Sequence, residues 1–449
     1  MAEEQKKSET SRATKSTETG KKLSGVLKEF YARSQKQSES GGPVAWCGNG
    51  IPPELLDNFE IRGFWPENYG TVCAATQTSV PFLELAEADG FSVDICSYVR
   101  NAIGYSIRRM QLGGQTPPEA PRGGMGNPSM MIDPSHSCDP KHKWFHSFNR
   151  YMKVPMHIYD TASPPEDVDC RDPEIAQQYI EHNTAQMRSL VDFFERQTGR
   201  KLDKKRLAES LIHTQEAQLL YYEVNELRKA TPSPMASQDH FAFIAPMQYM
   251  RGTREVVEIF RELRDEIKER VEKGIGVIPN EKHRVLWGGI PMWFNLGIFN
   301  YLEGMGAVSV IENTYGHGTK YGVEIDPDDP VKAIAEQIYW NRVETRSEEE
   351  SESGSTQADR ILEDVRDYAV DGVIIHTPRS CRATSIGQQH TKNVLTATLQ
   401  VPTVHFETDM GDARTYSDAQ VMMRINAFLE ALEVAKSGDL DRLSQLGTG

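Results

Sequence analysis

Two stretches of the sequence, residues 131–138 (MIDPSHSC) and 374–381 (IIHTPRSC), share one shape and decide the expected fold. Each reads as a short apolar strand, a brief loop and a Ser-Cys pair. Each is followed by a helical pattern and then by a second strand that opens with Val-Pro, at Val154 and at Val401. Both second strands close with an aromatic residue, an acid and Thr. Strands that alternate with helices in this way predict a parallel, doubly wound sheet.

The rest of the chain extends this rhythm into two α/β units joined by helices. Further strands are expected at 44–47 and 154–159 in the first unit and at 284–287, 307–311 and 401–406 in the second. Between the units, residues 172–273 carry apolar side chains at the three-and-four spacing of helices. We therefore predict an α/β fold with two Rossmann-like parallel-sheet domains, at 43–165 and 281–449, and a helical segment at 166–280. Residues 1–42 are polar and charged, which predicts a disordered tail with at most a short helix over 23–31.

Composition excludes several classes of protein. The 449 residues carry a formal charge of −15, which argues against nucleic acid as a partner because phosphates are neutralised by clustered Lys and Arg. No run approaches the roughly 18 apolar residues of a membrane helix, so we expect no membrane association. The first 42 residues lack the apolar core of a secretory signal, which predicts a cytoplasmic protein.

Cysteine chemistry is the main functional signal, although spacing alone leaves it open. Cys138 and Cys381 are each expected just beyond the carboxyl end of a strand, where open α/β sheets bind ligands. The following helix N-terminus favours a thiolate. Buried structural cysteines, a thiol nucleophile, a disulfide switch and an iron–sulfur cluster all remain possible uses. A cluster needs a third thiolate, for which Cys96 is the best candidate. Paired C-x-x-C zinc spacing is absent from the sequence.

Several short motifs, spread from about residue 43 to 435, give the chain a family resemblance. Together they resemble the 2-hydroxyacyl-CoA dehydratase and benzoyl-CoA reductase family, and within it the larger cluster-bearing subunit of ATP-dependent benzoyl-CoA reductase. The matching pieces are PVAW at 43–46, WPENY at 65–69, DICSY at 94–98, SCD at 137–139, GGIPMW at 288–293, RSC at 379–381, FETDM at 406–410 and DAR at 412–414.

The resemblance implies a cofactor. Family members bind a [4Fe-4S] cluster through three cysteines at the positions of Cys96, Cys138 and Cys381, and this leaves one iron without a protein ligand. The remaining cysteines are then expected to be structural, with a larger double-cubane cluster as the alternative; they are Cys47, Cys73 and Cys170.

The resemblance also implies a reaction, the two-electron reduction of benzoyl-CoA to a cyclohexadienoyl-CoA in anaerobic aromatic degradation. Implied partners are a second homologous cluster-bearing subunit, ATP-hydrolysing iron–sulfur activator subunits, ferredoxin as upstream donor and the acyl-CoA substrate. The chain has no phosphate loop of its own, which agrees with a subunit that receives electrons. Two alternatives are a subunit of a 2-hydroxyacyl-CoA dehydratase and a non-catalytic docking subunit.

Candidate residues for the chemistry lie near these motifs. Glu67 and His136 are the expected proton donors, weighed against a helix-capping role for Glu67 and a backbone hydrogen bond for His136. Trp65, Asn68 and Trp293 are the expected substrate-binding residues, although large aromatic residues are more often core. Gly288 and Gly289 follow a strand and permit close backbone approach, to substrate or cluster.

Overall fold

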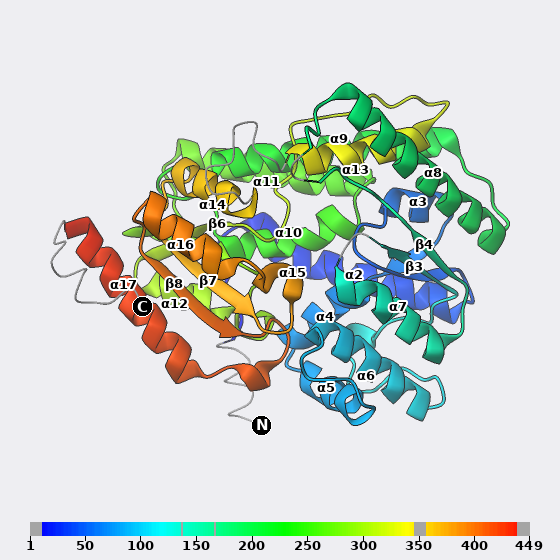
Figure 1. Cartoon of the computed structure of the whole chain (residues 1–449), viewed down its shortest axis with the longest axis horizontal. Helices are drawn as coiled ribbons and strands as arrows, with labels where there is room; N and C mark the ends of the chain where they lie inside the picture. Colours follow the sequence, from blue (N-terminus) through cyan, green and yellow to red (C-terminus); the bar gives the residue numbers. More distant parts are fainter. Residues whose placement is uncertain (1–10, 136–137, 166–167, 345–355, 438–449) are drawn as a thin grey trace.

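A computed structural model describes residues 11–135, 138–165, 168–344 and 356–437, and it contains two separate parallel sheets (Figure 1). The strand orders are β2-β1-β3-β4 and β6-β5-β7-β8. Numbered within its own unit, each sheet has the same order, 2-1-3-4. The predicted α/β class is therefore confirmed, and the two similar sequence stretches occupy equivalent places, at β3 and β7.

Every described strand pair is parallel. The strands are short and apolar, and those at the centre of each sheet are buried on both faces, as expected where helices cover a parallel sheet. Their bounds are β1 Val44–Cys47, β2 Arg62–Phe64, β3 Met130–Pro134, β4 Met156–Tyr159, β5 His283–Gly288, β6 Ala307–Glu312, β7 Gly372–Pro378 and β8 Thr403–Thr408.

Helices cover the first sheet, and several of them begin at the sequence motifs of the first unit. The WPENY motif at 65–69 lies between a strand and a helix, because Phe64 closes β2 and Pro66 opens α4. Proline is well tolerated at a first helical position because its missing N–H would have no partner there. The helices are α3 Pro53–Asn58, α4 Pro66–Ala75, α5 Ser79–Ala88, α6 Ser97–Gln111 and α7 Asp139–Met152, with the 3-10 turn η1 Pro121–Gly123.

The predicted helical segment contains four long helices. Figure 1 shows α9 and α11 lying alongside each other across one side of the molecule. Helix α13, from the second unit, packs against α8, so the segment links the two halves. The bounds are α8 Pro173–Thr198, α9 Lys204–Leu227, α10 Ser237–Tyr249, α11 Arg254–Glu272 and α13 Pro330–Glu344.

The second unit closes with α17, which packs along β8 at the edge of its sheet (Figure 1). Gly289 has φ +87°, and a Cβ there would meet the carbonyl oxygen of His376 at 2.1 Å. The close approach expected at this glycine is therefore to the neighbouring strand β7. The remaining elements are α12 Gly297–Gly304, α14 Thr356–Asp367, α15 Arg382–Ser385, α16 Gln388–Thr398 and α17 Asp418–Ser437, with η2 Trp293–Asn295 and η3 Ala413–Thr415.

One hydrophobic core joins the two units. Trp46 and Phe64 of the first sheet belong to the same buried cluster as Trp287 and Phe406 of the second. Burial of large aromatic side chains from both halves in one cluster holds the two sheets together. None of the described helices is long and apolar enough to cross a membrane.

The expected disordered tail is wrong over residues 18–39, because Glu18–Glu39 forms helix α2, which contains the short helix expected at 23–31. Leu23 and Tyr31 bury the apolar side of this helix against the rest of the chain. Thr17 caps its start, and Asp239 of α10 accepts hydrogen bonds from the backbone and hydroxyl of both Ser16 and Thr17. The many charged residues between the apolar side chains of α2 concealed its one-sided pattern.

Candidate functional site

The three predicted ligand cysteines share one local environment. Cys96, Cys138 and Cys381 each occupy the N-cap position of a helix, before α6, α7 and α15 respectively. All three are half-buried, whereas Cys47, Cys73 and Cys170 are buried. A sulfur at a helix N-terminus lies beside free backbone N–H groups, which stabilise a thiolate or a metal–thiolate bond.

These cysteines converge from distant parts of the sequence. The backbone N–H of Ser97, next to Cys96, donates a hydrogen bond of 3.0 Å to the hydroxyl of Ser380, next to Cys381. Ser380 in turn donates to the Asp409 carboxylate. The thiol of Cys381 also lies close enough to raise the pKa of both Cys96 and Cys138. Cys138 and Cys381 follow the equivalent strands β3 and β7, as predicted.

Burial dominates the electrostatics of the three thiols. It raises the pKa of Cys96 and Cys381, and it raises that of Cys138 to about 11, with the Glu67 carboxylate adding to each. Three adjacent thiolates therefore need a compensating positive charge. Among the described residues, their sulfur atoms do not form a set within 4.8 Å of one another, as the ligands of a single ion would. Three cysteine thiolates are the ligand type that binds a cationic iron–sulfide cluster.

Glu67 lies at the centre of this arrangement. It is the second residue of α4, and its Oε2 lies 2.9 Å from the Nζ of Lys141, which is 3% exposed. Burial lowers the pKa of the Lys141 ammonium, but the Glu67 carboxylate, together with Cys138 and Asp133, more than offsets this, so the net pKa is raised. Beside this pair, burial raises the pKa of Asp133 to about 7. A carboxylate, an ammonium and a protonatable carboxyl thus lie next to the thiols.

Glu67 also faces a cavity of about 550 Å³, which we call the aromatic cavity. Its wall includes the predicted residues Asn68 and Trp293. The indole N–H of Trp293 donates to the hydroxyl of Tyr98 at 2.5 Å, and burial raises the Tyr98 pKa, so this phenol keeps its proton. The other aromatic residues of the wall are Tyr31, Phe241, Tyr249 and Tyr315.

One of the predicted substrate-binding residues is not part of this wall. Trp65 is buried behind it, with its ring 4.6 Å from that of Tyr249, and it faces a small separate pocket. The wall position expected for Trp65 is therefore occupied by Tyr249, on which the indole packs. His136 lies outside the described residues.

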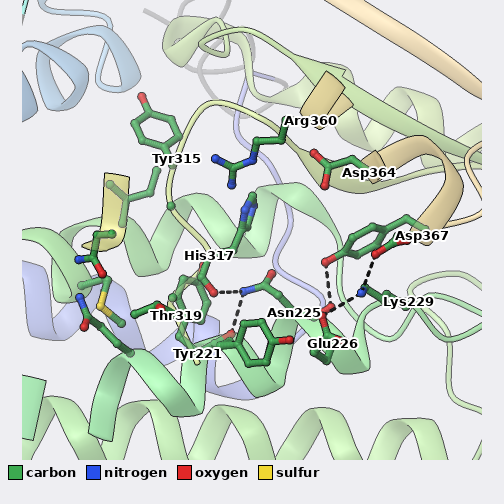
Figure 2. Close-up of a pocket in the computed structure, with 18 of the residues that line it drawn as sticks. Tyr221, Asn225, Glu226, Lys229, Tyr315, His317, Thr319, Arg360, Asp364 and Asp367 are labelled. Carbon is green, nitrogen blue, oxygen red and sulfur yellow. Dashed lines mark hydrogen bonds and ion pairs between the residues drawn. The ribbon is translucent and has the colours of Figure 1, made fainter. Parts of the chain in front are cut away.

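A second cavity, of about 410 Å³, adjoins the first and differs from it chemically; we call it the polar cavity. Figure 2 shows its walls, with Lys229 and Arg360 near Glu226, Asp364 and Asp367. Tyr315 and Ile244 line both cavities, so they form the partition between them.

A buried ionic cluster lies beside the polar cavity, which its member His317 lines. His240, Glu312 and His317 offer ligand atoms within 4.8 Å of one another, a spacing that suits one metal ion. The Glu312 oxygens, however, accept two hydrogen bonds from Arg228, at 3.0 and 2.9 Å. A divalent ion beside a fully buried guanidinium would be repelled. We therefore assign the cluster a structural role, holding the loop that carries Tyr315 and His317.

Several residues of the site were not predicted from the sequence. Tyr98 lies two residues after Cys96, inside a motif already singled out by resemblance. Tyr315 follows the carboxyl end of β6, in TYGHG at 314–318, and a Gly-flanked aromatic residue at a strand end was an available signal. Lys141 carried no signal, because the fold alone brings it to Glu67.

Comparison with known proteins places the chain in a family. The family model described as "2-hydroxyglutaryl-CoA dehydratase, D-component" matches residues 50–432. The chain is 27% identical over 416 residues to the (R)-2-hydroxyisocaproyl-CoA dehydratase alpha subunit of Clostridioides difficile, covering 92% of this chain and 96% of that one. It is 26% identical over 402 residues to the (R)-phenyllactyl-CoA dehydratase alpha subunit of Clostridium sporogenes, covering 89% and 92%.

A relative from the reductase branch is equally similar. The chain is 27% identical over 425 residues to a benzoyl-CoA reductase subunit of Thauera aromatica, covering 91% of this chain and 93% of that one. These relatives are subunits of enzymes named for CoA thioesters, and the family model covers most of the chain. The chain belongs to the 2-hydroxyacyl-CoA dehydratase and benzoyl-CoA reductase family.

Proposed function

We propose that this chain is the cluster-bearing, substrate-binding subunit of an ATP-dependent reductase that converts benzoyl-CoA, or a close aromatic analogue, to a cyclohexadienoyl-CoA. The observation that carries the proposal is the position of Glu67. This carboxylate lines the aromatic cavity and also raises the pKa of all three half-buried thiols. A flat aromatic acyl group in the cavity would therefore lie next to the redox site.

Cys96, Cys138 and Cys381 would hold a [4Fe-4S] cluster. When bound, the cluster supplies single electrons of low potential, and its fourth iron has no cysteine from this set. The half-buried sulfurs and their helix N-termini suit such a group, since they limit water and stabilise thiolates.

The chain's own residues then manage protons and orientation. The reduction adds two electrons and two protons to the ring, so a proton donor is needed at the cavity wall. The buried Lys141 ammonium, 2.9 Å from Glu67, would supply the proton, and the Glu67 carboxylate would relay it to the ring. Tyr98 and Tyr315, both kept protonated by burial, which raises the pKa of each, would donate hydrogen bonds to the thioester carbonyl. Phe241 and Trp293, whose rings pack at 5.6 Å, would hold the substrate ring.

The partners of the proposed enzyme are a second homologous subunit, an ATP-hydrolysing iron–sulfur activator and ferredoxin as upstream donor. A 2-hydroxyacyl-CoA dehydratase is the second candidate. It is favoured by the dehydratase alpha subunits among the relatives, which include one named for an aromatic substrate, phenyllactyl-CoA. In that reaction Glu67 would instead accept a proton from the carbon next to the departing hydroxyl.

One experiment separates the two. The assembled enzyme, with activator, reduced ferredoxin and ATP under anaerobic conditions, is given benzoyl-CoA or (R)-phenyllactyl-CoA. Formation of a dienoyl-CoA from benzoyl-CoA supports the reductase. Formation of cinnamoyl-CoA from phenyllactyl-CoA, without ring reduction, supports the dehydratase. Turnover of neither thioester would contradict both.

A further inference from the structure

The lining of the aromatic cavity has more positive than negative side chains, although the whole protein is acidic. Among the described residues, its lining includes the cationic side chains of Arg12, Lys15, Lys21 and Arg122, with Glu67 as the one carboxylate. The whole chain has 65 acidic and 50 basic residues. The polar cavity next door has three Lys and Arg side chains and four carboxylates. Local excess positive charge in an acidic protein concentrates anionic ligands at that opening.

Two of these cations have no carboxylate partner among the described residues. Arg12 and Arg122 are both exposed and form no salt bridge in the described part of the chain. Lys21 pairs with Glu18 at 2.5 Å on an exposed surface, and Lys15 donates to the backbone carbonyl of Gln238. Arg12 and Arg122 are thus available to a ligand, and a guanidinium forms paired hydrogen bonds with phosphate oxygens.

The segment that carries Arg12 is firmly attached. The Asn300 side chain donates to the Arg12 carbonyl at 2.9 Å and accepts from the Thr14 N–H at 3.0 Å. The buried Asp239 then fixes Ser16 and Thr17, at the start of α2. This is a built part of the cavity wall, and it holds the Arg12 backbone in place without any ligand.

A chain of contacts connects the Arg122 side chain to the reacting end of the cavity. The guanidinium of Arg122 lies 6.0 Å from the centre of the Tyr31 ring. The Tyr31 hydroxyl donates to Asn68 at 2.5 Å, and Asn68 follows Glu67 in α4. A ligand that spans this wall would place a charged end at Arg122 and an acyl end at Glu67.

We infer that Arg12 and Arg122 bind the phosphate groups of the coenzyme A portion of the substrate, and that the N-terminal segment 11–24 forms the entrance for the thioester. The inference rests on the proposed function only in that the substrate is a CoA thioester. It does not depend on which acyl group reacts. It assigns the substrate to this subunit rather than to its partner.

The test compares two thioesters of the same acyl group in the assembled enzyme. One is the CoA thioester and the other is the pantetheine thioester, which lacks the phosphates. In Arg12→Gln and Arg122→Gln, the KM for the CoA thioester is expected to rise about tenfold each, and about a hundredfold in the double variant. The KM for the pantetheine thioester is expected to stay within about twofold of wild type, which also shows that the variants fold.

Lys22 provides a matched control. It is next to Lys21 in α2 but does not line the cavity, and it pairs with Glu262 at 2.9 Å. Lys22→Ala should leave both KM values unchanged. An unchanged KM for the CoA thioester in the double arginine variant would overturn the inference, as would equal losses with both thioesters. Failure of the proposed function is distinguishable, because wild type itself would then turn over neither thioester.

Discussion

The aromatic cavity and the polar cavity share the partition of Tyr315 and Ile244, yet they differ in almost every chemical respect. The first has aromatic walls, two arginines without a carboxylate partner in the described part of the chain, and the three half-buried thiols beyond Glu67. The second has a surplus of carboxylates, and several of its charges are already paired, as Lys229 is with Glu226 and Asp367 (Figure 2). Volume alone does not identify a site, since the two are similar in size. Charged side chains without a partner and an adjacent set of three thiols do.

The largest expected difference between the cavities is catalytic. Glu67→Gln keeps the shape of the side chain but cannot accept and relay a proton, so kcat with benzoyl-CoA should fall about 100-fold to 10,000-fold. The matched change in the polar cavity is Glu226→Gln, which should leave kcat within about twofold of wild type. Anaerobic steady-state kinetics of the two variants measure this difference. Equal activity of Glu67→Gln and wild type would remove Glu67 from the proton pathway.

The next largest effect concerns the stability of the folded protein. It arises at the buried ionic cluster beside the polar cavity. Glu312→Gln leaves the buried Arg228 guanidinium without its carboxylate, which should lower the free energy of unfolding by about 3 to 5 kcal/mol. Asp329→Asn, which breaks the exposed pair with Arg188, should cost less than about 1 kcal/mol. Urea unfolding compares the two variants. A similar small loss in both would contradict the structural role of the buried cluster.

Each cavity also has a carboxyl group nearby whose stability contribution depends on pH. Burial raises the pKa of Asp133, near Glu67, and of Asp364, in the polar cavity, to about 7. The folded state therefore favours the neutral form of each carboxyl. The stability that this neutral form contributes is lost as pH rises from about 4 to about 7. Asp133→Asn cannot ionise. Relative to this variant, wild type should lose about 2 to 3 kcal/mol between about pH 5 and about pH 8.

Urea unfolding of wild type and Asp133→Asn at several pH values measures this difference. Wild type should also lose stability relative to Asp364→Asn as the pH rises. Parallel stability curves for wild type and Asp133→Asn would show that Asp133 ionises normally in the folded protein.

The smallest expected effect is at the partition itself. Tyr315→Ala should connect the two cavities and remove one aromatic wall, which raises the KM for benzoyl-CoA about fivefold to tenfold. Tyr315→Phe keeps the ring and should change KM by less than about threefold. If Tyr315→Ala alone accepts a larger naphthoyl thioester, the Tyr315 ring limits the size of the aromatic cavity. Identical kinetics in both variants would mean that the ring does not border the bound substrate.

Much of the fold was predictable from sequence because parallel strands leave a strong local pattern. The similar stretches at 131–138 and 374–381 indicated two equivalent units, and β3 and β7 confirm them. Helix α2 was predicted only over residues 23–31, because its few apolar residues, such as Leu23 and Tyr31, are separated by many charged ones. Its stability comes largely from tertiary contacts, including those of Asp239, which no local pattern shows.

Site residues that belong to a sequence motif could be predicted. Residues that reach the site only through the tertiary fold could not. Glu67, Asn68 and Trp293 lie in such motifs and line the same cavity. Trp65 belongs to the same motif as Glu67, but it lies behind the cavity wall and packs on Tyr249. Lys141 and Arg122 have no motif, because only the folded chain brings them to Glu67 and Tyr31.

The proposed cluster is tested most directly by the iron and acid-labile sulfide content of the anaerobically purified chain, with electron paramagnetic resonance of the reduced protein. We predict about four irons and four sulfides per chain. We also predict loss of most of that iron in each of Cys96→Ser, Cys138→Ser and Cys381→Ser, with full content in Cys47→Ser and Cys170→Ser. Iron-free wild-type protein, or serine variants of the three half-buried cysteines that keep their iron, would contradict the three-cysteine site.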